Sequence, residues 1–415
     1  MSDDARGRSP LYAWVVQCSC ARETRTNPDI MSKHDFSLAE FASRLARVRS
    51  AMSQSGIDWL VAVHPASIHW LTGSDAKSYQ EFQCLLVGPE GSPLVVLTRR
   101  GEMAEFETDS LADDVVGWGG GDIEDPMIPF QRLAERHGLT RSRVGVEVPA
   151  YYLHPHHYLA LRALLGAALV MEATDLIAEL KLVKSPAEIA YVRQAAGIAD
   201  AAMARFCATL AAGRTELHLA GEVHAELFAR NSGIAASPIN LVSGPRSAYS
   251  HGAPTERVLA PGDFGSIEFG ATWRRYTATL GRQFSLGVPT ARMRELYDVV
   301  RHASDAMIAT MADGVPAIVP HEAACRVIGA AGLEPYRVHT SGYSLGPGFP
   351  PSWGEPLHMI GGTRHILRAG MVVTVEPPVF IGSEGLGARI IDNVLIGRDG
   401  AELLSRHPRA LIVID

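Results

Sequence analysis

A helix-start signal at Ser185-Pro-Ala-Glu188 divides this chain into two stretches with different patterning. The hydroxyl of Ser185 and the carboxylate of Glu188 form a capping box, and Pro186 suits the first helical position. A chain of 415 residues has room for two domains, each with its own core. We therefore place a domain boundary near Lys184, with one domain over residues 35–182 and a second over residues 183–415.

The first domain alternates short apolar strands with helical segments. An amphipathic run begins at the capping box Ser37-Leu-Ala-Glu40 and stops at Gly56. Strand candidates follow at 58–63, 82–87, 94–97 and 144–148, and the Gly-Pro-Glu-Gly-Ser-Pro between two of them predicts a hairpin turn. Strands that alternate with helices predict an α/β domain.

The second domain has a different order of elements. Helices are predicted from Ser185 to Gly213, from Thr215 to Asn231 and from Ala291 to Asp313. The period then changes to two in the segments 264–286, 371–381 and 388–397, which predicts long strands joined by turns. Runs of helices beside runs of strands predict an α+β domain, with the helices packed over one antiparallel sheet.

Composition narrows the location and the partners of the protein. Residues 1–34 hold only a short apolar run, at 11–16, and we expect a disordered N-terminal extension there. The net charge of -7 and the lack of a basic stripe argue against nucleic acid, and no apolar run reaches the roughly 18 residues that span a bilayer. Five scattered cysteines indicate a reduced, cytoplasmic protein.

Several short motifs occur in a familiar order along the chain. They are Leu71-Thr72-Gly73, Lys184-Ser-Pro-Ala-Glu188, Ser243-Gly244 with His251, Gly262-Asp263, Tyr276 with Arg282, Ser341-Gly342, Thr374-Val-Glu-Pro377, and Arg389 with Asp392-Asn393. This series resembles the creatinase, aminopeptidase P and methionine aminopeptidase superfamily over most of residues 37–415. The resemblance implies a creatinase-like N-terminal domain followed by the pita-bread catalytic domain.

The resemblance also points to the positions where metallopeptidases of this superfamily bind two divalent metals. Those positions fall on Glu268, Thr279, Tyr343, Glu376 and Ile391. Divalent metals in such sites need anionic oxygens or a neutral imidazole, and threonine, tyrosine and isoleucine are poor replacements. We therefore expect that this chain has no metal centre and no other cofactor.

Three groups with catalytic potential remain at the matching positions: His251, Glu268 and Glu376. His339 falls where the peptidases carry a further histidine. The pattern is similar to creatinase, and the stretches around Glu268 and Gly342-Tyr-Ser-Leu-Gly346 resemble the ectoine-hydrolase-like branch. Two carboxylates at a metal-free cavity are costly without a compensating cation, which a cationic amidine or guanidino substrate would supply. We expect His251 to act as general base and acid, Glu268 as nucleophile or orienting group, and Glu376 as anchor.

Further side chains are candidates for substrate binding. Tyr343 and Trp353 would offer aromatic faces to a cation, and Arg275 and Arg389 would hold a carboxylate, although both arginines also suit a structural role as partners of Asp263 or Asp392. Because related proteins are commonly dimers whose N-terminal domains reach the neighbouring active site, the resemblance implies a homodimer, with Tyr79 in the contacting loop.

Two other functions stay open. A Xaa-Pro metallopeptidase would need metal ligands at 279, 343 and 391, and a non-catalytic pita-bread protein would use the old pocket only for binding. The set of His251, Glu268 and Glu376 favours a hydrolase of small-molecule C–N bonds, because a pure binding protein has no need of a base beside two carboxylates. The tract His154-Pro-His156-His157 resembles a metal-binding run, but we expect none there.

Overall fold

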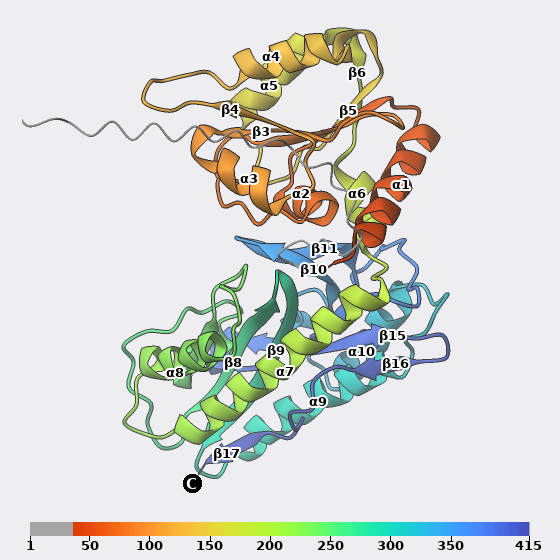
Figure 1. The fold of residues 1–415 in the computed structure, drawn as a ribbon. Helices are drawn as coiled ribbons and strands as arrows, with labels where there is room; N and C mark the ends of the chain where they lie inside the picture. The colour runs from red at the N-terminus through yellow and green to blue at the C-terminus, as the bar shows by residue number, and fades with distance from the viewer. Residues whose placement is uncertain (1–35, 415) are drawn as a thin grey trace, which may run out of the picture.

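The computed structural model describes residues 36–414 as two domains stacked on each other (Figure 1). The predicted disordered extension of residues 1–34 lies outside the described residues. Within the described part of the chain, no helix is long and apolar enough to cross a membrane. The boundary predicted near Lys184 falls between helices α6 (Thr174–Lys181) and α7 (Pro186–Thr209).

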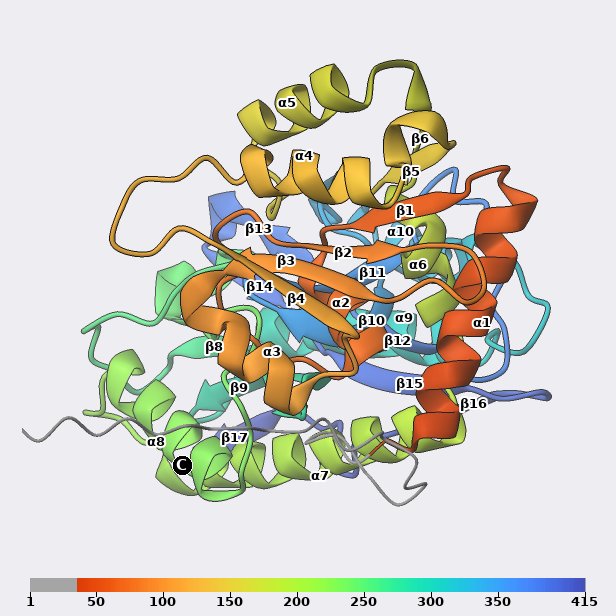
Figure 2. The same cartoon turned by 45° about the horizontal axis from the view of Figure 1, so that its top comes forward.

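The first domain is an α/β layer structure around a six-stranded sheet in the order β4-β3-β2-β1-β5-β6. Strands β1, β5 and β6 run parallel, whereas β2 is antiparallel to both of its neighbours. Helices α4 and α5 cover the face that points away from the second domain (Figures 1 and 2), and α1, α2 and α6 pack on the other face. The elements are α1 (Leu38–Gln54), β1 (Trp59–Ala62), α2 (Pro65–Thr72), β2 (Cys84–Val87), β3 (Val95–Arg99), α3 (Met103–Asp109), β4 (Asp114–Trp118), α4 (Met127–Arg136), β5 (Val144–Val146), α5 (Pro155–Leu165) and β6 (Leu169–Glu172).

The second domain is a nine-stranded sheet with two pairs of helices on one face. The main path of the sheet is β16-β15-β12-β10-β9-β8-β7, with β11 added to β10 and β17 added to β9. Helices α7 and α8 pack on β7, β8 and β9, and α9 and α10 pack on β12 and β15. The elements are α8 (Glu216–Ala229), β7 (Asn240–Ser243), β8 (Phe264–Trp273), β9 (Tyr276–Leu286), α9 (Ala291–Ile308), α10 (Ile318–Ala330), β10 (Tyr343–Phe349), β11 (Ser352–His358), β12 (Val372–Val375), β13 (Val379–Ile381), β14 (Leu386–Ala388), β15 (Asp392–Ile396), β16 (Ala401–Leu403) and β17 (Ile412–Ile414).

These two layers confirm the predicted fold class, an α/β domain followed by an α+β domain. The capping box at Ser185 is present, since its hydroxyl accepts from the Glu188 amide and the Glu188 carboxylate accepts from the Ser185 amide. Helix α10 was not predicted from the sequence pattern. Helix α9 was predicted to end at Asp313, but it ends at Ile308. The sheet is also not wholly antiparallel, because β17 pairs with β9 in the parallel direction.

A buried polar cluster joins the two domains around Glu188. Oε1 of Glu188 accepts hydrogen bonds from Trp70 Nε1 at 2.8 Å and from the Tyr276 hydroxyl at 2.7 Å. Arg44 lies 3.5 Å from the same oxygen and also donates to the carbonyl of Trp70 at 3.0 Å. Because the carboxylate has a cation and two neutral donors, its burial is compensated, and the cluster fixes the first domain against α7 and β9.

Candidate active site

Two strands of the second domain present carboxylates on the face of the sheet opposite helices α7 to α10. In β8, Ile267, Phe269 and Ala271 point into the core under α7 and α8, so the alternation of a strand directs Glu268 to the opposite face. In β12, Val373 and Val375 belong to the core under α9 and α10. The same alternation directs Glu376, the residue after β12, to the face of Glu268.

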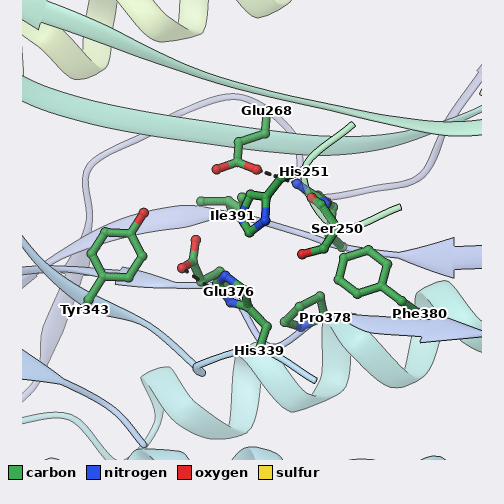
Figure 3. A pocket seen from close by; sticks show the side chains of 10 residues that line it. Ser250, His251, Glu268, His339, Tyr343, Glu376, Pro378, Phe380 and Ile391 are labelled. Carbon is green, nitrogen blue, oxygen red and sulfur yellow. Dashed lines mark hydrogen bonds and ion pairs between the residues drawn. The ribbon is translucent and has the colours of Figure 1, made fainter. Parts of the chain in front are cut away.

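These carboxylates line one small pocket with two imidazoles, a phenol and a guanidinium. Figure 3 shows Glu268 and Glu376 on opposite walls, with His251, His339 and Tyr343 around the space between them. The cavity measures about 30 Å³, which is room for one or two water molecules. The side chains that line it belong to Ser250, His251, Glu268, His339, Tyr343, Glu376, Pro378, Phe380, Arg389 and Ile391.

Arg389 neutralises Glu268 inside the pocket. Its Nη1 donates to Oε2 of Glu268 in a buried ion pair, and Nη2 donates to the carbonyl of Ser250. The same Oε2 accepts from Asn240 Nδ2 at 3.1 Å, and the guanidinium lies 5.1 Å from the ring centroid of Phe380. Both charges are almost fully buried, at 7% exposure for Glu268 and 5% for Arg389, so each depends on the other.

Glu376 has no such cation. Its Oε1 is buried without a hydrogen-bond partner among residues 36–414, and lies 3.9 Å from Nδ1 of His339. Burial raises the pKa of Glu376 well above its ordinary value, and the charge of Glu268 acts in the same direction. Burial also lowers the pKa of His339. Burial therefore favours the neutral forms of Glu376 and His339, opposite the carboxylate of Glu268 that pairs with Arg389.

Tyr343 forms a further wall of the pocket and is held by Trp353. The indole Nε1 of Trp353 donates to the hydroxyl of Tyr343 at 2.9 Å, and burial raises the pKa of that phenol. The ring of Trp353 packs against Gly270, where a Cβ atom would lie only 2.7 Å from it. Trp353 is not among the residues that line the pocket. The tryptophan therefore supports Tyr343 from behind.

His251 reaches the pocket from an exposed loop with a buried anchor. Glu216 in α8 is fully buried, and its carboxylate accepts from Ser243 Oγ at 2.7 Å, from Thr255 N at 3.0 Å and from Arg246 Nη1. Those three residues flank His251 on both sides along the chain. The His251 side chain is exposed at the pocket mouth, with its ring centroid 5.4 Å from that of His339.

Comparison with known proteins identifies the family of this chain. Residues 190–398 match the metallopeptidase family M24, and residues 44–183 match the creatinase/prolidase N-terminal domain. The chain belongs to the M24 family. It is 29% identical over 390 residues to the probable dipeptidase PepE of Mycobacterium tuberculosis, with 92% of this chain and 99% of the relative covered. It is 27% identical over 402 residues to the ectoine hydrolase of Halomonas elongata, with 91% and 98% covered. The crystal structure of PepE from Mycobacterium ulcerans superposes with a TM-score of 0.79 at 29% identity, with 91% and 98% covered.

The side chains at the five M24 metal positions do not fit two divalent cations. Thr279 is engaged by Asn393, whose Nδ2 donates to its hydroxyl at 2.9 Å. Tyr343 accepts from Trp353, and Ile391 presents only an aliphatic side chain to the pocket. Of the two glutamates at these positions, Glu268 already pairs with the fixed cation of Arg389. Within residues 36–414 no group of three histidine, cysteine, aspartate or glutamate side chains is arranged to hold a metal, and this includes the tract around His154.

The structure brings six of the predicted site residues together and leaves three outside the pocket. His251, Glu268, Glu376, His339, Tyr343 and Arg389 line the pocket. Arg275 instead pairs with Asp75 of the first domain and lies over Phe349, and Tyr79 packs in an aromatic cluster with Tyr152 and Phe349. Trp353, as described, lies behind Tyr343.

The structural partners predicted for the arginines are wrong. Asp263 pairs with Arg257 at 2.6 Å, and Asp392 pairs with Arg282 at 2.8 Å and with Arg409 at 2.7 Å. Three lining residues were also missed, namely Ser250, Pro378 and Phe380. Ser250 directly precedes His251, and Pro378 and Phe380 follow Glu376 in alternation, so proximity in sequence was the only available signal.

Replacing Tyr343 by phenylalanine is expected to destabilise the protein by about 1–3 kcal/mol, because the buried indole N–H of Trp353 loses its acceptor. Urea unfolding measures this change. The double variant Tyr343→Phe with Trp353→Phe is the matched control, since it removes the donor as well as the acceptor. A Tyr343→Phe protein as stable as wild type would show that this hydrogen bond contributes nothing.

Replacing Glu376 by glutamine is expected to change how stability depends on pH. Because the folded protein keeps a proton that the unfolded chain releases above its ordinary pKa of 4.5, the free energy of unfolding of wild type falls as pH rises from there until Glu376 itself ionises. The variant lacks this loss, so its stability relative to wild type should increase as pH rises above about 4.5, until Glu376 of the wild type ionises. Thermal unfolding at several pH values measures the difference, and parallel curves would contradict the prediction.

Proposed function

We propose that this M24 protein is a metal-independent hydrolase that cleaves a C–N bond of a small cationic amidine or guanidino compound, such as a cyclic amidine of the ectoine type. The observation that carries the proposal is the state of Glu376. It is a buried carboxyl group with an unpartnered oxygen, opposite the carboxylate that pairs with Arg389 and beside two imidazoles, in a pocket without the side chains for a metal pair.

The electrostatics of the pocket assign the anchoring of a cation to Glu376. On sequence grounds both carboxylates lacked a counter-charge, but Arg389 supplies one for Glu268. Glu376 has none, so an amidinium that enters would stabilise its ionised form and form a charge-assisted pair with it. Glu268 keeps its Oε1 free of hydrogen bonds from residues 36–414, so it can accept a second amidinium N–H and orient the ligand.

The proposed reaction uses water and no Lewis acid, because the positive charge of an amidinium already activates its carbon. His251 accepts a proton from water while the water oxygen bonds to the amidinium carbon, giving a tetrahedral intermediate. The C–N bond then breaks, its electron pair goes to the leaving nitrogen, and the imidazolium of His251 returns the proton to that nitrogen. As the carbonyl forms, the hydroxyl proton of the intermediate passes to the released amine, so the products are an amide, or a urea from a guanidino compound, and a protonated amine. Because the cavity measures only about 30 Å³, a substrate has to move side chains at the mouth, where His251 is exposed.

The comparisons support hydrolysis and leave a rival substrate. The relative from Halomonas elongata is named an ectoine hydrolase, whereas those from Mycobacterium are named dipeptidases. A Xaa-Pro peptidase activity would rest on the M24 metal pair, and the side chains at 279, 343 and 391 do not favour it. The proposal therefore follows the first relative for this chain.

The test measures metal content and turnover on one preparation of the full-length protein. Bound metals are quantified, and ectoine, 5-hydroxyectoine, creatine and an Ala-Pro dipeptide are assayed with and without a chelator. We expect turnover of an amidine at the same rate with and without chelator, at well under one metal ion per chain. Arg205→Met, which removes only a surface ion pair with Glu222, serves as the control variant.

Two outcomes would contradict the proposal. Chelator-sensitive cleavage of the dipeptide with a full complement of bound metal would show that the protein is a Xaa-Pro metallopeptidase. Binding of an amidine without turnover would identify a non-catalytic member of the family that keeps the pocket for recognition.

A further inference from the structure

A cavity of about 260 Å³ lies between the two domains, and no residue lines both it and the candidate active site. Its walls are the loops that follow β1 and β5, one face of α6, and residues of β10 and β11. Because β1, β5 and β6 run parallel, their carboxyl ends meet at this edge of the sheet. Open α/β sheets commonly bind ligands beyond the carboxyl ends of their strands.

Lys181 determines the chemistry of this cavity. It lies in the last turn of α6 and is only 5% exposed, yet its ammonium has no hydrogen-bond partner among residues 36–414. Since Lys181 lines the cavity, its N–H groups are available to an acceptor there. Burial lowers the pKa of Lys181, against the opposing effect of Glu355 and Glu147. A ligand with a hydrogen-bond acceptor would therefore supply the partner that the ammonium of Lys181 lacks.

The neighbouring carboxylates each accept at least one hydrogen bond from another donor. Glu147 accepts from the amides of Val63 and His64 at 2.8 and 2.9 Å and from Ser67 Oγ at 2.7 Å. Oε2 of Glu355 pairs with Lys184 at 2.5 Å, and its Oε1 is buried without a hydrogen-bond partner among residues 36–414. Of the buried charged side chains that line the cavity in the described part of the chain, Lys181 is the one without a hydrogen bond.

We infer that the interdomain cavity is a second ligand site, which binds a small carboxylate through the ammonium of Lys181. The carboxylate oxygens accept from the lysine N–H groups, and the rest of the ligand occupies the space between α6 and β11. The volume accommodates a few heavy atoms beyond the carboxylate, as in a short carboxylic acid or an amino acid. This inference does not depend on the proposed amidine chemistry.

The position of the site connects it to the active pocket. Gly354 and Glu355 of β11 line the cavity and directly follow Trp353, which holds Tyr343 in the active pocket. The Tyr343 ring also lies against Gly354, since a Cβ there would be 3.5 Å from Cδ2 of the ring. A carboxylate in the cavity therefore contacts the strand that supports one wall of the candidate active site.

Saturation-transfer NMR on the full-length protein tests the site with acetate, glycine and methylammonium as probes. We expect transfer to acetate, glycine or both, and none to methylammonium, which has no carboxylate. Binding to acetate identifies a simple acid site, and binding to glycine alone identifies a site for amino acids. In Lys181→Met the affinity should fall about 10-fold or more, as expected for the loss of a charge-assisted hydrogen bond. The methionine has a similar volume and needs no partner, so the variant should fold.

Two further variants keep the test independent of the lysine. Ala178→Phe fills the cavity from α6 without changing a charge and should also abolish binding. His251→Ala changes only the active pocket and should bind the probes as wild type does. The inference is overturned if neither carboxylate binds wild type, if Lys181→Met binds as tightly as wild type, or if His251→Ala loses the binding.

Discussion

Arg389→Met should destabilise the folded protein by about 3–5 kcal/mol, because it leaves the buried carboxylate of Glu268 without its cation. The methionine retains most of the volume of the arginine, so the change removes charge more than packing. Both groups are nearly inaccessible to water, and therefore solvent cannot take over the role of the guanidinium. Glu268→Gln alone should be similarly costly, since it leaves the buried guanidinium without its counter-ion.

A double-mutant cycle separates the ion pair from other effects. Arg389→Met combined with Glu268→Gln removes both charges, and should recover most of the stability that either single variant loses. Arg205→Met is the control, because its partner Glu222 is at the surface and such pairs contribute about 0–1 kcal/mol. Urea unfolding at neutral pH provides the measurement. Single losses that simply add in the double variant would show that Arg389 and Glu268 do not act as a pair.

The Arg389–Glu268 pair also explains how a metal-binding fold persists without suitable ligands. In a dinuclear centre, divalent cations neutralise the inward-facing carboxylates. Here a guanidinium neutralises one of them, and burial raises the pKa of the other well above its ordinary value. Under the proposed function, a cationic ligand would favour the ionised form of Glu376, which burial disfavours.

Much of this arrangement could be predicted from the sequence, because strand alternation and motif order decide it. Two-residue periodicity in 264–286 and 371–381 directs Glu268 and Glu376 to the same face once the domain is recognised. The helix-start signal at Ser185 likewise predicted the start of α7. Such local patterns depend on neighbours in the chain and need no knowledge of distant partners.

The pairing of charged side chains could not be predicted, since it depends on contacts across the fold. Arg389 and Glu268 are 121 positions apart, and nothing in the sequence distinguishes Arg389 from Arg257 or Arg282 as a partner for a given carboxylate. The place of Trp353 depended on Gly270, where the lack of a side chain leaves room for the indole. Lys181 gave no signal either, because only the meeting of two domains makes it a buried amine.

His251→Ala should reduce kcat/KM for the hydrolysed amidine about 10²–10⁴-fold, which is the usual contribution of a positioned general base or acid. Its effect on stability should be within about 0.5 kcal/mol, because the side chain is exposed and outside the core. Loss of activity without loss of fold distinguishes a chemical role from a structural one. His154→Ala, an exposed histidine of the first domain, is the matched control and should keep full activity.

Chemical rescue makes this prediction specific to the imidazole. Because His251 is at the mouth of the pocket, added imidazole can occupy the space that the alanine leaves, and it should restore part of the lost rate in a concentration-dependent way. The same addition should not rescue Glu376→Gln, whose missing group is an ionisable carboxyl inside the pocket. If His251→Ala retains the wild-type rate, or if imidazole rescues both variants equally, the proton transfers assigned to His251 belong to another group, and His339, 5.4 Å away between ring centroids, becomes the candidate.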